Sequence, residues 1–395
     1  MPAPDQQPVV DARSTSDPAH NAAHAAALQA AAQSAEPQRA GSQQLEAMRL
    51  GLLGASRIAQ SAVIDASQHT GDELTAVAAR DPKRARAYAA EHGFAGIRDS
   101  YTELVEDDSL DLIYIGLPNG FHAEWSAKAL EAGRSVLVEK PFAANLAEFD
   151  RVTARLEAGE GWIWEAFHYD DHPLMQRVLE ILASGEIGEL REIKLSMRME
   201  EPDASDPRWE FALAGGAMMD VGCYAVHALL LLAETTGSNI AVDSVVAELW
   251  PADPLVDSLV DAQLTLTRAG AGAADGGVEN GTVPVTLRAS MVHDTVDFSL
   301  ELIGTTGTVF APSYVKPQDD DRIIVRTVTD AGEVVREERA GTAATYVFQL
   351  ERIRAELRGG VKDPARLARS RATMALIDDI YLAAGLPVRP GRLTD

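Results

Sequence analysis

RLGLLGASRIAQSAVI, residues 49–64, passes from a short apolar run directly into a segment with apolar residues at helical spacing. At the βα turn of a dinucleotide-binding fold, the first fingerprint position needs glycine for a tight turn, and the second and third need small residues. Gly54, Ser56 and Ala59 occupy these positions. The Ser56 hydroxyl adds a phosphate donor, and the following helix would present its N-terminal N–H groups. The stretch alone fits a dinucleotide site and an ordinary strand–helix junction equally well.

Strand and helix candidates alternate along residues 48–165, which is the pattern of a doubly wound parallel sheet. The strand candidates are residues 73–80, 110–118 and 135–141, and the helix candidates are residues 81–93 and 120–133. The segment LDLIYIGLP, 110–118, is almost continuously apolar, as in a parallel sheet that is covered on both faces. We therefore expect a Rossmann domain over residues 48–168.

The pattern changes after an amphipathic helix predicted over residues 173–189. Strand candidates then follow at 190–200, 244–250, 261–268, 283–294, 297–305, 307–313 and 322–330, and helix candidates at 215–237, 344–360 and 364–385. The Gly/Ala-rich residues 268–282 are expected to form a mobile hairpin insertion. The predicted fold class is thus α/β, with a C-terminal α+β domain over residues 169–395 that contains a large, open, mostly antiparallel sheet.

Composition argues against several function classes. The 395 residues include 35 basic and 60 acidic side chains, and the net charge of −25 disfavours nucleic-acid and anionic-membrane partners. Cys223 is the only cysteine, which rules out an internal disulfide and a cysteine zinc cluster. No apolar run approaches the roughly 20 residues of a membrane span. The Ala-rich residues 1–47 lack a secretory pattern and are expected to be a disordered tail, so we expect a cytoplasmic protein.

Arg80 and Asp81 follow the second predicted strand, where a dinucleotide fold recognises the ribose. An acidic residue there binds the NAD ribose, whereas a basic residue accommodates a 2′-phosphate. Arg80 therefore favours NADP, with NAD as the alternative. Asp81 precedes Pro82 and is interpreted either as a ribose ligand or as a helix N-cap.

Lys140 follows a predicted strand in VLVEKPFA, residues 136–143, and the C-terminal ends of parallel strands border the ligand crevice. Pro141 ends the strand and would fix the direction of the lysine. Asn119 and His122 follow the preceding strand at the same edge. The alternatives are a solvated surface lysine and a His122 that caps a helix.

Asp220, Tyr224 and His227 lie at positions i, i+4 and i+7 of a predicted helix and so share one face. The alternative interpretation is a core helix whose polar stripe meets water. A polar-aromatic patch, WEAFHYDDHPL, occupies residues 164–174 at the domain junction.

The chain resembles the glucose–fructose oxidoreductase / inositol dehydrogenase family (Gfo/Idh/MocA), nearest the branch of D-xylose 1-dehydrogenases and dihydrodiol dehydrogenases. The resemblance covers residues 48–390 and rests, in order, on GLLGASRIA, AARDPKRARAYA, LPNGFHAEW, VEKPFA, EAFHYDDHP, GGAMMDVGCY and TYVFQLERIRAELRGG. It implies NAD(P)-dependent oxidation of a sugar or related alcohol and a C-terminal sheet used for homo-oligomerisation. The reverse reduction, and a non-catalytic dinucleotide sensor or scaffold, are the alternatives.

The resemblance also implies roles for individual residues. Lys140 would lie beside the nicotinamide and the substrate, and Tyr224 would be the acid/base, its pKa lowered by the Lys140 ammonium. The expected catalytic residues are Lys140, Tyr224 and Asp220, of which Asp220 would orient the lysine or a cofactor ribose. The expected substrate-binding residues are Lys140, His168, Tyr224 and His227. The expected cofactor-binding residues are Gly54, Ser56, Arg57, Ile58, Arg80, Leu117, Pro118, Asn119, His122, Glu139 and Lys140. No metal site is expected.

Asp170 and Asp171 depart from the family pattern, in which an arginine and an aromatic residue usually stand. Those positions are usual substrate contacts in the family. We therefore expect the substrate contacts of this segment to differ.

Overall fold

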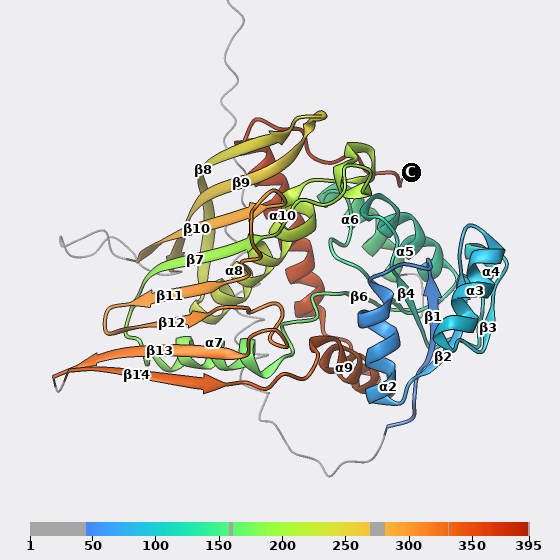
Figure 1. The fold of residues 1–395 in the computed structure, drawn as a ribbon, viewed down its shortest axis with the longest axis horizontal. Coiled ribbons are helices and arrows are strands. Elements are labelled where there is room, and N and C mark those ends of the chain that lie inside the picture. The colour runs from blue at the N-terminus through green and yellow to red at the C-terminus, as the bar shows by residue number, and fades with distance from the viewer. Residues whose placement is uncertain (1–44, 158–160, 269–280, 331, 394–395) are drawn as a thin grey trace, which may run out of the picture. The chain divides into compact units, whose positions relative to one another are not determined.

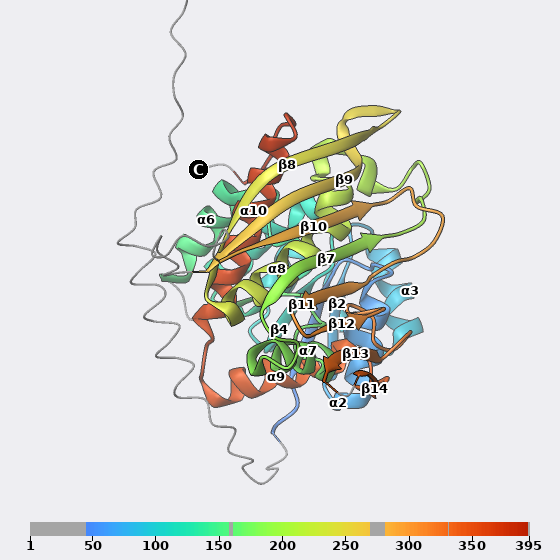
Figure 2. The same cartoon turned by 90° about the vertical axis from the view of Figure 1, so that its left-hand side faces the viewer.

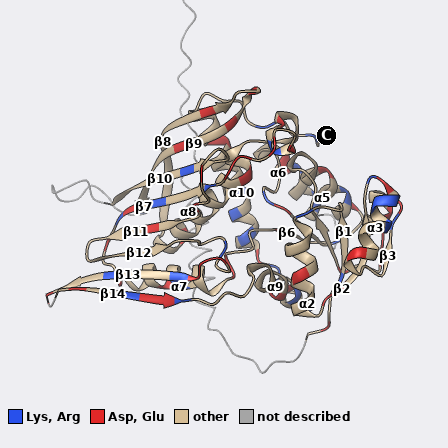
Figure 3. Cartoon of the chain, viewed as in Figure 1, with Lys and Arg blue, Asp and Glu red and all other residues tan. Residues whose placement is uncertain are grey.

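The computed structural model of the chain describes residues 45–157, 161–268, 281–330 and 332–393. They form two β-sheets, here called sheet A and sheet B, with helices packed around them (Figure 1). The predicted tail lies outside the described residues up to residue 44, and so do residues 269–280 of the predicted insertion. Basic and acidic residues are interspersed along most of the elements (Figure 3).

Sheet A consists of six parallel strands in the order β3-β2-β1-β4-β5-β6. The strands are β1 (Arg49–Leu53), β2 (Glu73–Ala78), β3 (Gly96–Ile97), β4 (Leu112–Ile115), β5 (Val136–Val138) and β6 (Ile163–Glu165). Its helices are η1 (Gln60–Asp65), α2 (Ala66–Thr70), α3 (Pro82–His92), α4 (Tyr101–Val105), η2 (Asn119–Phe121), α5 (His122–Glu131), α6 (Leu146–Thr153) and η3 (Ala154–Glu157). The strand order reverses between β1 and β4, the switch point at which dinucleotide folds bind their ligand. The predicted doubly wound parallel sheet is confirmed.

Sheet B consists of eight strands in the order β14-β13-β12-β11-β7-β10-β9-β8. The strands are β7 (Leu190–Arg198), β8 (Ser238–Trp250), β9 (Asp253–Arg268), β10 (Thr282–Ser290), β11 (Leu300–Gly304), β12 (Gly307–Ala311), β13 (Arg322–Thr329) and β14 (Gly332–Arg339). All neighbouring pairs are antiparallel except β7 and β10. The predicted large, mostly antiparallel sheet is confirmed.

Helices cover one face of sheet B, and the other face is turned toward the viewer in Figure 2. The helices of this part are α7 (Pro173–Ser184), η4 (Pro207–Trp209), η5 (Phe211–Leu213), η6 (Met218–Gly222), α8 (Cys223–Thr236), α9 (Thr345–Gly359) and α10 (Pro364–Ala383). Helix α8 contacts β7, β8 and β10, whereas α10 contacts α8, α6 and β6 and so joins the two sheets. The stretch Phe211–Thr236 is long and apolar enough to cross a membrane, but 94% of its most apolar part is buried, as in a core helix.

The boundaries of α3 follow from its local sequence. The Asp81 carboxylate accepts a hydrogen bond from the backbone N–H of Lys83 at 2.8 Å, and Pro82 occupies the first turn. Gly93 ends the helix with a φ of +82°, a conformation that glycine adopts without a steric penalty. Asp81 is therefore the N-cap of α3, which was one of its two interpretations.

Candidate functional site

A cleft of about 450 Å³ lies between sheet A and sheet B. On the sheet A side it is lined by the turns that follow β1, β4 and β5, and on the sheet B side by β7, the segment before α8 and the segments flanking β11 and β12. The turns are those that the sequence motifs singled out. They meet at one edge because the C-terminal ends of neighbouring parallel strands lie side by side.

The turn after β1 has the space and the donor that a dinucleotide phosphate needs. Gly54 adopts a φ of +103°, and a Cβ there would lie 2.7 Å from Cδ2 of Leu117. A Cβ at Gly116 would lie 2.6 Å from Oγ of Ser56. This Oγ is buried and has no hydrogen-bond partner among the described residues. An unsatisfied buried hydroxyl costs roughly 1–3 kcal/mol, so the turn fits a phosphate acceptor.

Arg57 and Ile58 also line the cleft. The Arg57 side chain is 93% exposed, and its guanidinium lies 3.6 Å from the carboxylate of Asp206 on the opposite side. Such an exposed pair contributes about 0–1 kcal/mol. Arg57 is therefore free to exchange this partner for a ligand anion.

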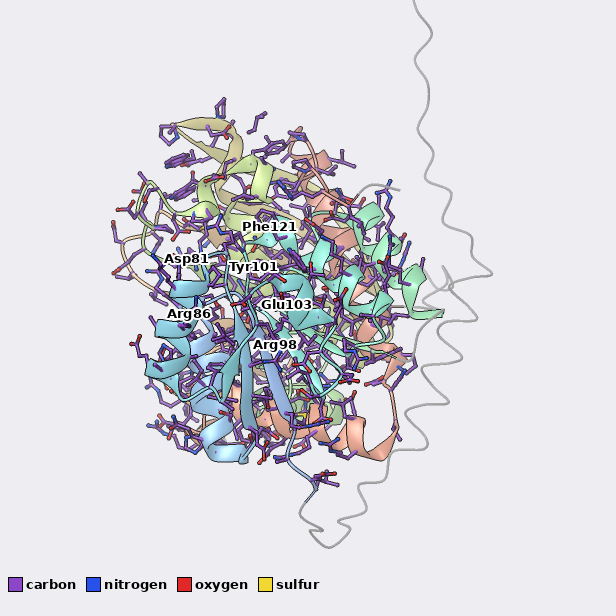
Figure 4. The ribbon with its side chains drawn as sticks, turned by 90° about the vertical axis from the view of Figure 1, so that its right-hand side faces the viewer. Asp81, Arg86, Arg98, Tyr101, Glu103 and Phe121 are labelled. Carbon is purple, nitrogen blue, oxygen red and sulfur yellow. The ribbon has the colours of Figure 1, made fainter. Side chains whose placement is uncertain are left out.

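Arg80 is exposed two residues beyond β2, outside the residues that line the cleft. Figure 4 looks onto this end of sheet A and labels Asp81 at the start of α3. Sequence reasoning missed Arg84, whose Nη2 donates to the carbonyl oxygen of Ala55 at 2.7 Å, in the turn after β1. The signal was the basic run RDPKRAR, in which Arg84 stands four positions after Arg80.

Leu117, Pro118 and Asn119 line the cleft, as expected. The side-chain amide of Asn119 donates to the carbonyl oxygen of Ala214 at 3.2 Å. This contact ties the turn after β4 to the loop before α8. A hydrogen bond thus links the two sides of the cleft.

His122 lies behind the cleft and does not line it. The side chain is fully buried, with Nδ1 2.7 Å from the carbonyl oxygen of Pro141 and Nε2 2.7 Å from that of Leu117. Burial lowers the pKa of His122 to about 4. The ring links the turn after β4 to the turn after β5, because both of its nitrogens contact main-chain oxygens. This corrects the expected cofactor contact, and His122 is not a helix N-cap either, because it is the first residue of α5, whose N-cap is Phe121.

Lys140 is held inside the cleft by Asp220. Its Nζ donates to the backbone oxygen of Asp220 at 2.6 Å and lies 3.2 Å from Oδ1 of the same residue. The other carboxylate oxygen pairs with Nε of Arg208 at 2.8 Å. Burial opposes the charge on Lys140, but the Asp220 carboxylate, with smaller contributions from Cys223 and Glu139, outweighs burial, and the pKa of Lys140 is raised. The alternative of a solvated surface lysine is thereby excluded.

Glu139 lines the cleft beside Lys140. Its carboxylate accepts a hydrogen bond from the hydroxyl of Tyr114 at 2.6 Å. Burial raises the pKa of Glu139, against the opposing effect of the Lys140 charge. The residue is thus an acceptor at the end of β5.

Tyr224 lines the cleft, and its hydroxyl lies 3.1 Å from Nε2 of His168. Nζ of Lys140 lies 5.1 Å from the centre of the Tyr224 ring and is bonded to Asp220 instead. Burial raises the pKa of Tyr224 well above its ordinary value of 10. The expectation that the Lys140 ammonium lowers this pKa is corrected, because burial outweighs a charge directed elsewhere.

His168 and His227 differ from their expected roles as substrate contacts. His168 lines the cleft, but Nδ1 contacts Thr345 and Nε2 contacts Tyr224, so neither nitrogen is free. His227 does not line the cleft: its ring stacks on Phe167 at 4.0 Å, and Nδ1 lies 2.9 Å from the hydroxyl of Tyr169. The stripe on α8 therefore meets the cleft at one end and the core at the other, rather than water.

Asp170 and Asp171 point away from the cleft, into an ion-pair cluster with α10 and α9. Arg366 of α10 donates to both carboxylates at 2.6 Å, and Arg352 of α9 donates to Asp171 at 2.6 Å. An internal cavity of about 20 Å³ borders the cluster. The departure from the family pattern thus changes an interior contact, which corrects the expectation that it alters substrate contacts.

The sheet B wall of the cleft is largely apolar, which sequence reasoning missed. Met197, Met199, Val296, Phe298 and Val315 line it, and Lys316 lies at its edge. Sheet order brings these residues together from separate segments, so no local motif signals them. Among the described residues, no cluster of three or more His, Cys, Asp or Glu side chains is arranged to hold a metal ion.

Two family models match the chain. One, the oxidoreductase family with an NAD-binding Rossmann fold (GFO_IDH_MocA), matches residues 48–167, and the other, the GFO/IDH/MocA C-terminal domain, matches residues 175–310. An uncharacterised oxidoreductase of Rhizobium meliloti is 30% identical over 348 residues, which cover 86% of this chain and 98% of that protein.

A D-xylose 1-dehydrogenase (NADP(+)) of Haloferax volcanii is 43% identical over 189 residues, 48% of this chain and 58% of that enzyme. The chain thus matches little more than half the length of this relative. Among solved structures, the 3-ketoreductase KijD10 of Actinomadura kijaniata, in complex with NADP and TDP-benzene, has a TM-score of 0.74 at 23% identity. That similarity covers 86% of this chain and 98% of KijD10, and it concerns the fold.

Proposed function

The chain belongs to the Gfo/Idh/MocA oxidoreductase family, and on this basis we propose that it oxidises or reduces a sugar or related cyclic or secondary alcohol with a nicotinamide cofactor. One observation carries the proposal: Lys140, fixed by Asp220, and Tyr224 line the same cleft as the small-residue turn after β1. A proton-transfer group and a charged donor thus border a dinucleotide-sized space.

The cofactor that best fits the turn is NADP. Ser56 supplies a buried Oγ that has no hydrogen-bond partner in the described part of the chain, and Arg57 borders the same turn. Arg80, whose guanidinium forms no ion pair within the described ranges, would bind the 2′-phosphate. When bound, the nicotinamide ring supplies or accepts a hydride.

The chain's own residues hold the substrate and move its proton. An ammonium has three N–H donors, and two of those on Lys140 are directed to Asp220. The third is available to a substrate oxygen. Tyr224 would take the hydroxyl proton during oxidation and return it during reduction, a contribution typically worth about 10²–10⁴-fold in rate. Asp220 positions Lys140 and keeps it charged.

The apolar wall favours a substrate ring with one poorly hydroxylated face. Met197, Met199 and Phe298 offer it no hydroxyl or amide partner. A fully hydroxylated sugar would leave buried hydroxyls unpaired there, at roughly 1–3 kcal/mol each. We therefore propose deoxygenated sugars and cyclic diols as preferred substrates over unmodified hexoses.

Turnover of NADP or NADPH with aldoses, deoxysugars, cyclic diols and the matching ketones tests the proposal. Wild-type protein should turn over at least one of them, and the variants Lys140→Met and Tyr224→Phe should lose at least 10²-fold in kcat/KM. Tight NADP binding without turnover across the whole panel would instead favour the sensor or scaffold function. Unchanged turnover in both variants would remove the roles given to Lys140 and Tyr224.

We further propose a Rossmann domain over residues 48–168, a C-terminal domain over residues 169–395, and a homo-oligomer formed through sheet B. The oligomer is supported by exposed valines on its strands, among them Val246 at 66% and Val334 at 53% exposure. Light scattering of Val246→Glu against wild type tests it, because a charge in the interface should lower the measured mass. A cytoplasmic location is proposed with this function and is tested by cell fractionation.

A further inference from the structure

A chain of two hydrogen bonds leads from the start of α9 to the hydroxyl of Tyr224. Oγ1 of Thr345 lies 2.7 Å from Nδ1 of His168, and Nε2 of His168 lies 3.1 Å from the Tyr224 hydroxyl. The three residues come from α9, the segment between β6 and α7, and α8. All are buried, with 0%, 2% and 7% of their surface exposed. The chain is therefore shielded from water except at the cleft.

The direction of these bonds follows from the number of protons available. A neutral imidazole carries one N–H, so one ring nitrogen donates and the other accepts. The Thr345 hydroxyl has one proton, and Nδ1 of His168 is its only acceptor within the described residues. Leaving that buried proton unpaired would cost roughly 1–3 kcal/mol. Thr345 therefore donates to Nδ1, which places the ring proton on Nε2, facing the oxygen of Tyr224.

His168 stays neutral in this arrangement. Its pKa is lowered to about 3, chiefly by burial and also by the charges of Lys140 and Lys316, against the opposing charge of Asp170. The ring of Tyr346 packs against the imidazole at 4.0 Å, and burial raises the pKa of Tyr346, so that its hydroxyl stays protonated at neutral pH. Burial is the largest cause of the raised pKa of Tyr224, and Tyr346, Glu139, Cys223 and Asp220 raise it as well.

We propose that Thr345 and His168 form a donor chain that stabilises Tyr224 in its deprotonated form. This inference rests on the proposed function of Tyr224 as the residue that exchanges the substrate proton. A tyrosinate buried among groups that raise its pKa needs a hydrogen-bond donor. The Nε2–H group of His168 is that donor, because Lys140 lies over the ring and not at the oxygen. Thr345 and His168 are positioning residues, since they act through Tyr224.

The proton and electron balance is as follows for oxidation. The substrate hydroxyl gives its proton to the tyrosinate oxygen of Tyr224, while the carbinol C–H bond breaks and its electron pair leaves with the hydrogen as hydride to the nicotinamide cofactor. The C–O bond becomes a double bond. His168 keeps its proton on Nε2 throughout, and Thr345 keeps its own. Reduction runs the same transfers in reverse, with the tyrosine hydroxyl as the donor.

The first test uses the protein without cofactor or substrate. In ¹⁵N-histidine-labelled protein, the imidazole nitrogen shifts of His168 should indicate a protonated Nε2 and an unprotonated Nδ1, and His168→Gln identifies its signals. Thr345→Val removes the donor to Nδ1 and should abolish this preference, whereas Thr345→Ser should retain it. A proton on Nδ1 in the wild type, or an unchanged tautomer in Thr345→Val, would overturn the donor chain.

The second test is the pH profile of oxidation. Thr345→Val should move the midpoint of the rise in kcat to higher pH, with about a tenfold loss at neutral pH and little change in KM, and Thr345→Ser should restore the profile. An unshifted midpoint in Thr345→Val overturns the proposal. Failure of the proposed function and failure of the donor chain give different results. If the wild type turns over no substrate but shows the Nε2–H tautomer, the proposed function is contradicted. If it turns over substrate but shows the opposite tautomer, only the donor chain is contradicted.

Discussion

The ammonium of Lys140 is anchored to Asp220 through both the main chain and the side chain, at 2.6 Å from the backbone oxygen and 3.2 Å from Oδ1. The carboxylate of Asp220 is itself shared with Arg208, at 2.8 Å. Burial alone would lower the pKa of Lys140, and the Asp220 carboxylate is the largest of several contributions that together reverse that effect. The charge at the centre of the cleft therefore depends mainly on this buried carboxylate.

Asp220→Asn should lower the pKa of Lys140, because burial then acts on the ammonium without its counter-charge. The high-pH limb of the kcat/KM profile should move to lower pH, so that the loss of activity grows as the pH rises. Lys140→Met should lose about 10²-fold or more at every pH, in line with the loss of one preorganised donor. Lys128→Met in α5, whose exposed side chain pairs with Glu124, is the matched control and should change neither value. A high-pH limb in Asp220→Asn that coincides with the wild type would contradict this coupling.

Arg80→Ala should weaken NADP binding far more than NAD binding. A 2′-phosphate gains a charge-assisted hydrogen bond from a guanidinium, worth about 1.5–3 kcal/mol, or roughly tenfold to a hundredfold in Kd. NAD has no such group and should lose little. Arg86→Ala on α3, which begins just after Arg80, is the control, because its side chain is 62% exposed and paired with Asp99. Calorimetric Kd values of wild type and Arg80→Ala for NADP and NAD test this prediction. An equal loss of affinity for both cofactors would contradict the role of Arg80 in binding the 2′-phosphate.

Much of the fold could be predicted from the sequence, because the patterns that mark single strands and helices lie within short segments. Strand β4 was found as a nearly continuous apolar run, and α3 as a segment between Asp-Pro and Gly. Strand β14 was missed, because its sequence GEVVREER is charged and almost wholly exposed and lacks an apolar face. The strand forms because its backbone pairs with β13, and this pairing has no counterpart in the side-chain pattern of β14.

The candidate site was only partly predictable, for a physical reason. The motifs located Lys140, its partner Asp220 and Tyr224, but not the hydrogen bond between His168 and Tyr224. His168 meets Tyr224 across 56 positions in the chain, and this contact depends on how α8 crosses the segment after β6. Likewise, a lone histidine in a motif does not reveal that both nitrogens of His122 contact carbonyl oxygens. Such contacts arise from packing and have no signature in spacing.

Glu165→Gln should stabilise the fold more at pH 8 than at pH 5. Oε1 of Glu165 accepts from the backbone N–H of Phe142 at 2.8 Å, whereas Oε2 is buried without a partner in the described structure. Burial raises the pKa of Glu165 from 4.5 to about 7. An acid whose pKa is raised on folding disfavours the folded state progressively as pH rises from its unfolded pKa to its folded pKa. The penalty is absent below about pH 4.5 and complete above about pH 7.

The difference in free energy of unfolding between Glu165→Gln and wild type should therefore grow by about 1–3 kcal/mol between pH 5 and pH 8, at 1.36 kcal/mol per pKa unit. Denaturant titrations at the two pH values measure it. Glu131→Gln, whose side chain is 56% exposed, should show no such growth. A difference that stays constant with pH would show that Glu165 ionises normally in the fold.

Arg389 anchors the C-terminal segment to the start of the helix that carries Asp220 and Tyr224. Its fully buried guanidinium pairs with the carboxylate of Asp257 and donates to the carbonyl oxygen of Gly215 at 2.6 Å. The same carboxylate accepts from the backbone N–H of Met218, the first residue of η6, at 2.7 Å. A buried pair of this kind orients η6, and through it the start of α8.

Arg389→Ala should destabilise the fold by about 3–5 kcal/mol, because it leaves the Asp257 carboxylate buried and unpaired. Arg371→Ala, which breaks an exposed pair with Asp150, should cost only about 0–1 kcal/mol. In the double variant Arg389→Ala/Asp257→Asn, part of the loss should be recovered, since no uncompensated charge remains. Denaturant unfolding of the four proteins gives the comparison. A cost for Arg389→Ala as small as that of Arg371→Ala would mean that water reaches the pair, and the C-terminal segment would then not hold η6 in place.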